Sequence, residues 1–237
     1  MIRIFIFSYS GDAAEAVACV RCARMAVPCA SVTVVDDASS PVQEETAEAL
    51  RSMGAEYVQS SWERHGNLRG PDCIRGMLSE MCREAEDDDI LVKVDCDTAL
   101  LDGGWLRWME QRPWCQMYTS GDFVNGDWRV FGCLYALRGW IARRLYREMD
   151  WSLLDDRAPE DWTIGREVLA RVPAALCRID EPWRKRSPWS IWTAWCWPSR
   201  TVSAESYAAR FAVVITGSPR MSNQPASERA RVMHLLA

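Results

Sequence analysis

Residues 89–97 read Asp89-Ile90-Leu91-Val92-Lys93-Val94-Asp95-Cys96-Asp97. The apolar and β-branched middle of this segment predicts a buried strand, because such side chains suit a pleated sheet that is covered on both faces. Asp95 and Asp97 follow at the end of that strand. Carboxylate oxygens are the ligands that hard divalent cations prefer. The segment therefore predicts a strand that delivers a candidate metal site to a loop.

Upstream of this strand, short apolar runs alternate with segments of helical periodicity. The predicted strands are 2–8, 31–36, 55–60 and 90–95, and the predicted helices are 12–27, 44–53 and 71–85. This order indicates an α/β fold with a mostly parallel sheet flanked by helices on both faces. Ligands of such sheets bind beyond the carboxyl ends of the strands. We therefore expect the loops 8–12, 36–41 and 95–98 to face one crevice.

The second half of the chain has a looser pattern. It predicts strands 115–120 and 130–137 around a loop 121–127, helices 139–149 and 159–172, strands 176–179 and 211–216, and a terminal helix 228–236. No internal repeat or linker divides the sequence. We therefore expect a single domain over residues 1–237.

Composition excludes several classes of protein. The chain has 237 residues, a formal charge of -5 and 49% hydrophobic residues, which describes a globular protein and argues against a nucleic acid partner. The apolar residues 1–7 are too short for a signal-peptide core, and no apolar run reaches the ~18–20 residues of a transmembrane helix. We therefore expect a cytoplasmic location. The ten cysteines are scattered through apolar segments and predict small buried thiols.

Three segments together resemble a known family. Val34-Val35-Asp36-Asp37-Ala38-Ser39-Ser40 resembles the VVDDGS segment of glycosyltransferases of the GT-A type, family-2-like, and Val92–Asp97 resembles their DxD strand. Between them, residues 66–72 with Arg75 look like the segment that precedes the helix before DxD. The resemblance covers about residues 2–105. Ala38 departs from it, because glycine is usual there, and the QxxRW segment of processive members is missing.

The resemblance implies a GT-A-like nucleotide-diphospho-sugar transferase architecture, with residues 1–105 as the nucleotide-sugar-binding half and 106–237 as the acceptor-binding half. It implies Mn²⁺ or Mg²⁺ as cofactor, held by the DxD pair Asp95 and Asp97. It also implies a nucleotide-diphosphate sugar donor, with a UDP-sugar favoured. The implied donor contacts are Tyr9, Asp36, Asp37, Arg75 and Asp95.

Residues 158–162 supply the candidate base. They resemble the Glu-Asp segment of inverting family members, in which a carboxylate accepts the proton of the acceptor hydroxyl. The resemblance implies Asp161 as this base, with Glu160 as its substitute. A structural alternative is open, because acidic residues in the first turn of a helix are also favoured by the helix dipole.

Five tryptophans between residues 183 and 197 accompany a basic triplet. Indole rings stack on sugars, so Trp189 and Trp192 are candidates for binding a saccharide acceptor. Peripheral membrane contact with a lipid-linked acceptor and ordinary core packing are the alternatives.

The function expected from these features is metal-dependent transfer of a single sugar from a nucleotide-diphosphate sugar to an acceptor hydroxyl, with inversion. One alternative is a non-catalytic GT-A-like domain that binds nucleotide or glycan or acts as a scaffold. A sugar-phosphate nucleotidyltransferase is a further alternative, although such enzymes usually carry a Gly-rich loop after the first strand. Residues 8–12 do not supply such a loop.

Overall fold

The computed structural model describes residues 1–64, 68–124, 127–181, 193–194, 209, 211–216 and 226–236. Trp189, Trp192 and the rest of the tryptophan-rich segment lie outside them, apart from 193–194. Their predicted contact with an acceptor therefore stays a prediction.

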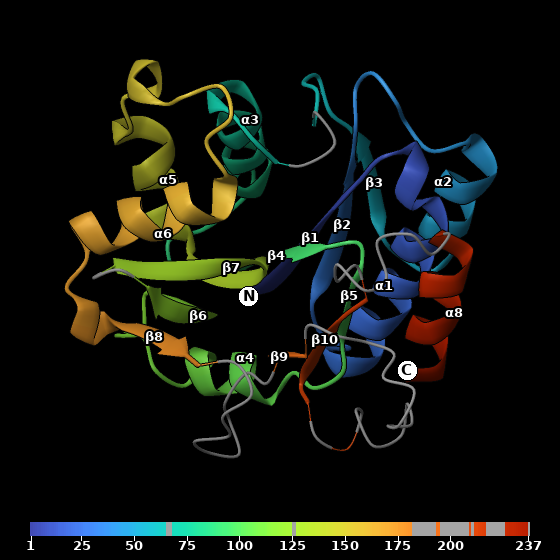
Figure 1. The fold of residues 1–237 in the computed structure, drawn as a ribbon. Helices are drawn as coiled ribbons and strands as arrows, with labels where there is room; N and C mark the ends of the chain where they lie inside the picture. The colour runs from blue at the N-terminus through green and yellow to red at the C-terminus, as the bar shows by residue number, and fades with distance from the viewer. Residues whose placement is uncertain are drawn as a thin grey trace.

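A mixed sheet of seven strands forms the centre of the molecule, in the order β3-β2-β1-β4-β7-β6-β8 (Figure 1). Its strands are β1 (Ile2–Ser8), β2 (Ser31–Asp36), β3 (Glu56–Gln59), β4 (Ile90–Asp95), β6 (Met117–Val124), β7 (Asp127–Arg138) and β8 (Cys177–Asp180). Strands β1 to β4 pair in parallel, whereas β7 runs antiparallel to both β4 and β6. Burial of this sheet on both faces explains why β1 and β4 are almost continuously apolar.

Helices cover both faces of the sheet (Figure 1). One face carries α3 (Pro71–Cys82), α5 (Gly139–Glu148) and α6 (Glu160–Arg171), and the other carries α1 (Ala13–Ala26), α2 (Glu44–Ser52), α4 (Gly104–Glu110) and α8 (Ala226–Leu236). Each layer encloses its own apolar core. None of the described helices is long and apolar enough to cross a bilayer.

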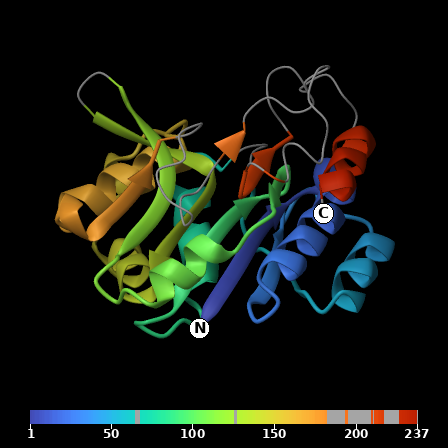
Figure 2. The same ribbon diagram turned by 90° about the horizontal axis from the view of Figure 1, so that it is seen from below.

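A second, three-stranded sheet lies next to α1 (Figure 2). It is formed by β5 (Thr98–Leu100), β10 (Val213–Ile215) and β9 (Thr193–Ala194). At its edge, the backbone N–H and the hydroxyl of Thr216 both donate to the carbonyl oxygen of Asp97, at 2.7 and 2.9 Å. The C-terminal part of the chain thus fixes the loop that carries Asp97.

The structure confirms the α/β fold with a mostly parallel sheet flanked by helices. The predicted loop 121–127 is wrong, because residues 121–124 continue β6 and pair with β7. Gly121 and Asp122 resemble turn residues in sequence, but a cross-strand ion pair between Asp122 and Arg129 at 2.6 Å supports an extended hairpin. The helix α4 and the strand β5 were not predicted.

Candidate functional site

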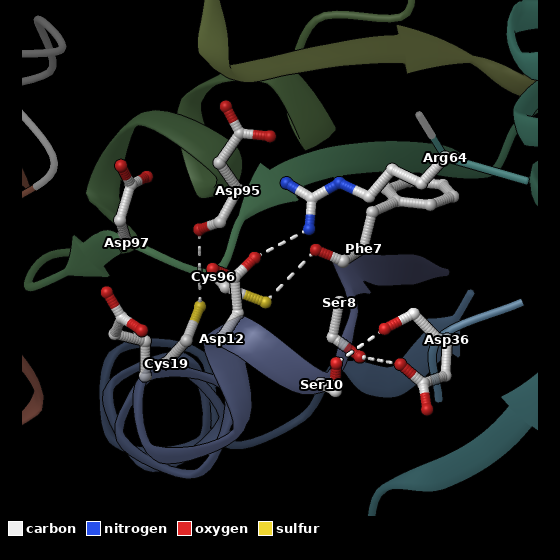
Figure 3. A network of polar contacts seen from close by, with 12 residues as sticks. Phe7, Ser8, Ser10, Asp12, Cys19, Asp36, Arg64, Asp95, Cys96 and Asp97 are labelled. Atoms are coloured by element: carbon white, nitrogen blue, oxygen red, sulfur yellow. Dashed lines mark hydrogen bonds and ion pairs between the residues drawn. The ribbon is translucent and has the colours of Figure 1, made fainter. Parts of the chain in front are cut away.

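The carboxyl ends of three parallel strands meet at one edge of the sheet. The register pairs Ser8 with Asp36 and Phe7 with Asp95, so the residues after β1, β2 and β4 lie side by side. Figure 3 shows the polar side chains that gather there. The predicted grouping of these loops therefore follows directly from the parallel register.

Asp36 organises the loop after β2. Its carboxylate is 1% exposed and accepts hydrogen bonds from the Ser8 hydroxyl at 2.7 Å, the Tyr57 hydroxyl at 2.6 Å and the backbone N–H of Val42 at 2.7 Å. These three hydrogen bonds use most of the positions at which a carboxylate can accept a hydrogen bond. Asp36 therefore lies at the predicted edge of the sheet, but its contacts are those of a residue that shapes the loop.

Asp37 follows on the same loop and is also buried. Its carboxylate accepts a hydrogen bond of 3.1 Å from the backbone N–H of Ser39, which is the geometry of an Asx turn. Among the described residues, its hydrogen bonds come from within the loop, from the N–H and the hydroxyl of Ser39. Asp37 is thus better placed than Asp36 to offer an oxygen to a ligand.

Asp95 and Asp97 lie together with Asp12 at the ends of β1 and β4 (Figure 3). Burial and the neighbouring carboxylates of Asp95 and Asp12 together raise the pKa of Asp97 to about 6, although Arg64 and Lys93 lower it. Burial likewise raises the pKa of Asp12. Carboxylates held this close disfavour each other's ionisation, so the cluster favours an added positive charge.

An ion pair between Arg64 and Asp12 closes one side of this cluster. The Arg64 guanidinium lies 2.6 Å from the Asp12 carboxylate. The side chain of Arg64 is 9% exposed and that of Asp12 is 14% exposed. The guanidinium also lies over the ring of Tyr9, 5.1 Å from its centroid. Burial lowers the pKa of Arg64, but the carboxylates of Asp12 and Asp95 raise it overall, so the guanidinium stays charged.

Sequence reasoning did not identify Arg64 or assign Asp12 to the site. Asp12 precedes α1 but makes no side-chain cap hydrogen bond there, and its carboxylate pairs with Arg64 instead. Arg64 lies in an irregular segment without periodicity. Asp12 could have been found from its place in the first loop of the crevice, whereas Arg64 carries no such signal.

The structure does not bring the predicted Arg75 to this cluster. Arg75 is exposed on α3, and its guanidinium lies 6.0 Å from the centroid of the Tyr146 ring on α5. It lines a cavity of about 540 Å³ together with Trp62 and Glu63. Basic groups whose charge does act on Asp97 include Arg64 and Lys93.

Lys93 connects the DxD loop to α6. It is 1% exposed, and its ammonium lies 2.6 Å from Asp95 and 3.2 Å from Glu160, and donates to the carbonyl oxygen of Gly132. Side chains two positions apart on a strand point to the same face, which explains why Lys93 and Asp95 meet. A lysine inside an apolar strand is a signal that sequence analysis could have used, because buried lysines are almost always paired.

Glu160 and Asp161 begin α6 beside the middle of β7. Glu160 is 5% exposed. Burial and the carboxylates of Asp95 and Asp161 raise the pKa of Glu160 to about 7, although Lys93 lowers it. Burial also raises the pKa of Asp161. A Cβ atom at Gly132 would lie 3.0 Å from the Asp161 Cβ and 3.1 Å from a Glu160 oxygen, so glycine permits this close approach. The structure thus joins Glu160 to Asp95 through Lys93, and Asp161 follows Glu160 directly in the chain.

The C-terminal helix α8 also contributes charge. Arg229 forms an ion pair with Glu15, which lies on α1 and is fully buried. Burial raises the pKa of Glu15 to about 7 even though Arg229 lowers it. The carboxylates of Glu15, Asp97 and Asp12 all raise the pKa of Arg229, which burial lowers. Arg229 therefore places a positive charge beside the acidic cluster.

The donor set at this edge suits a divalent cation that is shared with a substrate. Within the ranges that the structure describes, no three or more His, Cys, Asp or Glu side chains are placed to hold a metal by themselves. Magnesium and related ions often take one or two carboxylates and complete their coordination with substrate phosphates. Asp95 and Asp97 provide such a pair, and the raised pKa of Asp97 shows that positive charge is favoured there.

Comparison with known proteins identifies the fold. No protein-family model and no curated protein sequence matches the chain. Among solved structures, it is similar to galactosyltransferase LgtC in complex with donor and acceptor sugar analogs, with a TM-score of 0.58, 13% identity and coverage of 98% of this chain and 95% of that chain.

Two further structures have the same architecture. Glucosyl-3-phosphoglycerate synthase from Mycobacterium tuberculosis, in complex with Mn²⁺, UDP and glucosyl-3-phosphoglycerate, has a TM-score of 0.52, 13% identity and coverage of 76% and 69% of the two chains. A cytidylyltransferase from Leptospira borgpetersenii has a TM-score of 0.52, 15% identity and coverage of 80% and 79%. The chain therefore has a GT-A-type nucleotide-sugar transferase fold, as the sequence motifs predicted.

Proposed function

We propose that this GT-A-type chain is a metal-dependent glycosyltransferase that moves a single sugar from a nucleotide-diphosphate sugar to an acceptor hydroxyl, with inversion. The observation that carries the proposal is the contact of Lys93 with both Asp95 and Glu160. It connects Asp95, which is expected to serve the donor, to Glu160, the expected substitute for Asp161 as the base. A transferase needs these two groups within one site.

The donor half of the proposed site lies over β1, β2 and β4. Asp37 would contact the base or ribose, with Tyr9 beside it, and Asp36 would hold the loop in place. Arg64 would face the diphosphate, in place of the predicted Arg75, because its guanidinium lies next to the acidic cluster. A UDP-sugar is the favoured donor.

Asp95 and Asp97 would hold the Mn²⁺ or Mg²⁺ ion together with oxygens of the diphosphate. When bound, such a cation neutralises the negative charge that develops on a departing diphosphate. Lys93 would keep one Asp95 oxygen in a fixed position from within the strand. Arg64 and Lys93 also offset the charge of the carboxylates when no donor is present.

The acceptor half supplies the base. The acceptor oxygen would attack the anomeric carbon, forming the new glycosidic bond while the bond from that carbon to the diphosphate oxygen breaks. The hydroxyl proton would pass to Asp161 or Glu160, and the bonding pair would leave with the nucleoside diphosphate. A raised pKa suits this role, because a base works best when its pKa is close to the working pH.

Two other functions share parts of this arrangement. The likeness to a cytidylyltransferase keeps nucleotidyl transfer to a sugar phosphate as a second candidate. The loop Ser8-Tyr9-Ser10-Gly11-Asp12 argues against it, because it does not have the glycine content of a phosphate-binding loop. A non-catalytic domain that binds nucleotide or glycan would keep the donor site and lack turnover.

An assay of nucleoside diphosphate release separates these functions. Purified protein with Mn²⁺ is incubated with UDP-, GDP- and TDP-sugars and a panel of saccharide acceptors, and products are followed by mass spectrometry and by the anomeric couplings in their NMR spectra. The proposal predicts a single added sugar of inverted configuration. Pyrophosphate release from a nucleoside triphosphate and a sugar phosphate would identify a nucleotidyltransferase instead.

A further inference from the structure

A cavity of about 520 Å³ opens beside the start of α6. Its walls include Trp128 and Arg129 from β7, Leu153 from the connection after α5, and Pro159 and Trp162 around the candidate bases. Its volume lies in the range of about 300–1,000 Å³ that is usual for small-ligand sites. The cavity therefore has the size and location of a binding site on the α6 side of the sheet.

Exposed apolar side chains gather at the rim of this cavity. Trp162 is 55% exposed, Leu153 is 80% exposed, and Phe123, which packs edge-on against Trp128 at 5.4 Å, is 60% exposed. Large apolar side chains that gather in this way on an accessible surface mark a site of contact with a ligand or partner. Flat indole and phenyl rings suit the C–H faces of a sugar ring.

The charges around the cavity are balanced. The guanidinium of Arg129 lies 2.6 Å from the carboxylate of Asp122, and that of Arg166 lies 3.2 Å from the carboxylate of Glu167. The carboxylate of Asp155 adds a negative charge to the wall. A ligand with its own negative charge would have to compete with these carboxylates. The charge pattern therefore favours a neutral occupant.

The cavity lies at the first turn of α6, the turn that carries the candidate bases. Pro159 and Thr163, which both line it, flank Glu160 and Asp161 in the first turn of α6. The backbone N–H of Trp162 also donates to the Asp161 carboxylate at 2.8 Å. The carboxylates of Asp122 and Asp161 both raise the pKa of Arg129, which lines the cavity, so the charge of Asp161 reaches the cavity wall.

Backbone contacts hold this wall in place. Arg69 and Pro159 form an isolated β-bridge, and the N–H of Gly70 donates to the carbonyl oxygen of Ala158 at 3.0 Å. Gly70 has φ +80, and a Cβ atom there would lie 2.7 Å from the Asp156 carbonyl oxygen. Only glycine suits both the positive φ and the lack of space for a Cβ atom. The cavity is therefore pre-formed and does not depend on a ligand for its shape.

We propose that this cavity is the acceptor subsite and that it takes an uncharged pyranoside, with the apolar face of the sugar against Trp162 and a hydroxyl directed to Asp161 or Glu160. The proposal rests on the proposed glycosyltransferase function. It differs from the sequence prediction, which assigned acceptor binding to Trp189 and Trp192.

The test measures binding of neutral p-nitrophenyl glucoside, galactoside and mannoside by saturation-transfer NMR, with p-nitrophenyl glucuronide and p-nitrophenol as comparisons. The variants are Trp162→Ala and, as a matched control, Trp114→Ala, whose side chain is 47% exposed and packs against Trp108 away from the cavity. We expect at least one neutral glycoside to bind, with about tenfold weaker binding in Trp162→Ala and no change in Trp114→Ala.

Three results would overturn the proposal. The first is that a neutral glycoside binds equally well to Trp162→Ala and to the unchanged protein, and the second is that the glucuronide binds more tightly than the neutral glycosides. The third is that p-nitrophenol, which carries no sugar, binds by itself. The melting temperature of each variant shows whether it is folded, and a UDP- and Mn²⁺-dependent shift tests the donor site separately. A normal donor shift with no effect of Trp162→Ala refutes the subsite alone. A missing donor shift with Trp162-dependent glycoside binding refutes the transferase instead.

Discussion

The ammonium of Lys93 lies 3.2 Å from the carboxylate of Glu160, and both side chains are nearly excluded from solvent. The same ammonium is 2.6 Å from Asp95. One buried cation thus lies between two carboxylates from different elements, β4 and α6. This arrangement explains how the two halves of the proposed site are held in a fixed relation before any substrate binds.

Replacing Lys93 by methionine tests this arrangement. Loss of the cation leaves Glu160 buried without its counter-charge, and breaking a buried ion pair from one side typically costs about 3–5 kcal/mol. We expect the free energy of unfolding in urea to fall by about this amount. Adding Glu160→Gln to Lys93→Met should recover part of the loss, because the uncompensated charge is gone. Equal stability of Lys93→Met and the unchanged protein would contradict the structure.

Stability without ligands should fall as the pH rises toward neutrality. The pKa values of Glu15 and Glu160 are about 7 and that of Asp97 is about 6, all above the ordinary range of carboxyl groups. The folded state therefore binds these protons more tightly than the unfolded chain does. This stabilising contribution is complete below about pH 4 and is lost as the pH rises through about 6 to 7.

Thermal unfolding between pH 5 and pH 8 measures this effect. Glu15→Gln should flatten the dependence, because it removes one of the groups with a raised pKa. Glu45→Gln on the exposed surface of α2 is a matched control and should leave the slope unchanged. A melting temperature that rises steadily over this range in the unchanged protein would contradict the assigned environments.

The candidate bases can be distinguished by mutation. Asp161→Asn and Glu160→Gln preserve side-chain shape while removing the acceptor of the proton, and loss of a general base typically lowers the rate by about 10²–10⁴-fold. We expect one of the two variants to show this loss in kcat while its affinity for the nucleoside diphosphate is retained. If Glu160 is the base, kcat/KM should rise with pH up to about 7, because only the ionised carboxylate accepts a proton. Full activity in both variants would exclude this pair as the base.

Substitution of Arg64 and substitution of Arg75 should have different effects on the binding of UDP. Arg64→Gln should weaken binding of UDP by about tenfold or more, because a buried charge beside the proposed diphosphate is lost. Arg75→Gln should leave it unchanged, because Arg75 is exposed near Tyr146. Calorimetric titration with UDP compares the two variants directly. A loss in Arg75→Gln without one in Arg64→Gln would restore the prediction made from sequence.

Most of the fold could be predicted because its signals are local. β1, β2 and β4 are apolar runs that end at polar residues, and their predicted bounds agree with the structure. β5 escaped prediction because it pairs with β10, which is distant in sequence. The hairpin around Asp122 escaped prediction because its residues favour turns, whereas a cross-strand ion pair with Arg129 supports the extended conformation.

The candidate site was only partly predictable for the same reason. Sequence motifs identify four of its residues, which are Asp95, Asp97, Glu160 and Asp161. Arg64 joins them through the fold alone, from an irregular segment after β3. Lys93 was visible within its strand, but its pairing with Glu160 depends on the packing of α6 against β7.

The central claim is that Asp95 and Asp97 share a divalent cation with a nucleoside diphosphate. Isothermal titration of UDP at pH 7.5, with and without Mn²⁺, measures this directly in the unchanged protein and in Asp97→Asn. We expect Mn²⁺ to strengthen the binding of UDP at least tenfold in the unchanged protein. In Asp97→Asn, we expect Mn²⁺ to leave the affinity for UDP unchanged. UDP binding that is the same with and without Mn²⁺ in both proteins would contradict the claim.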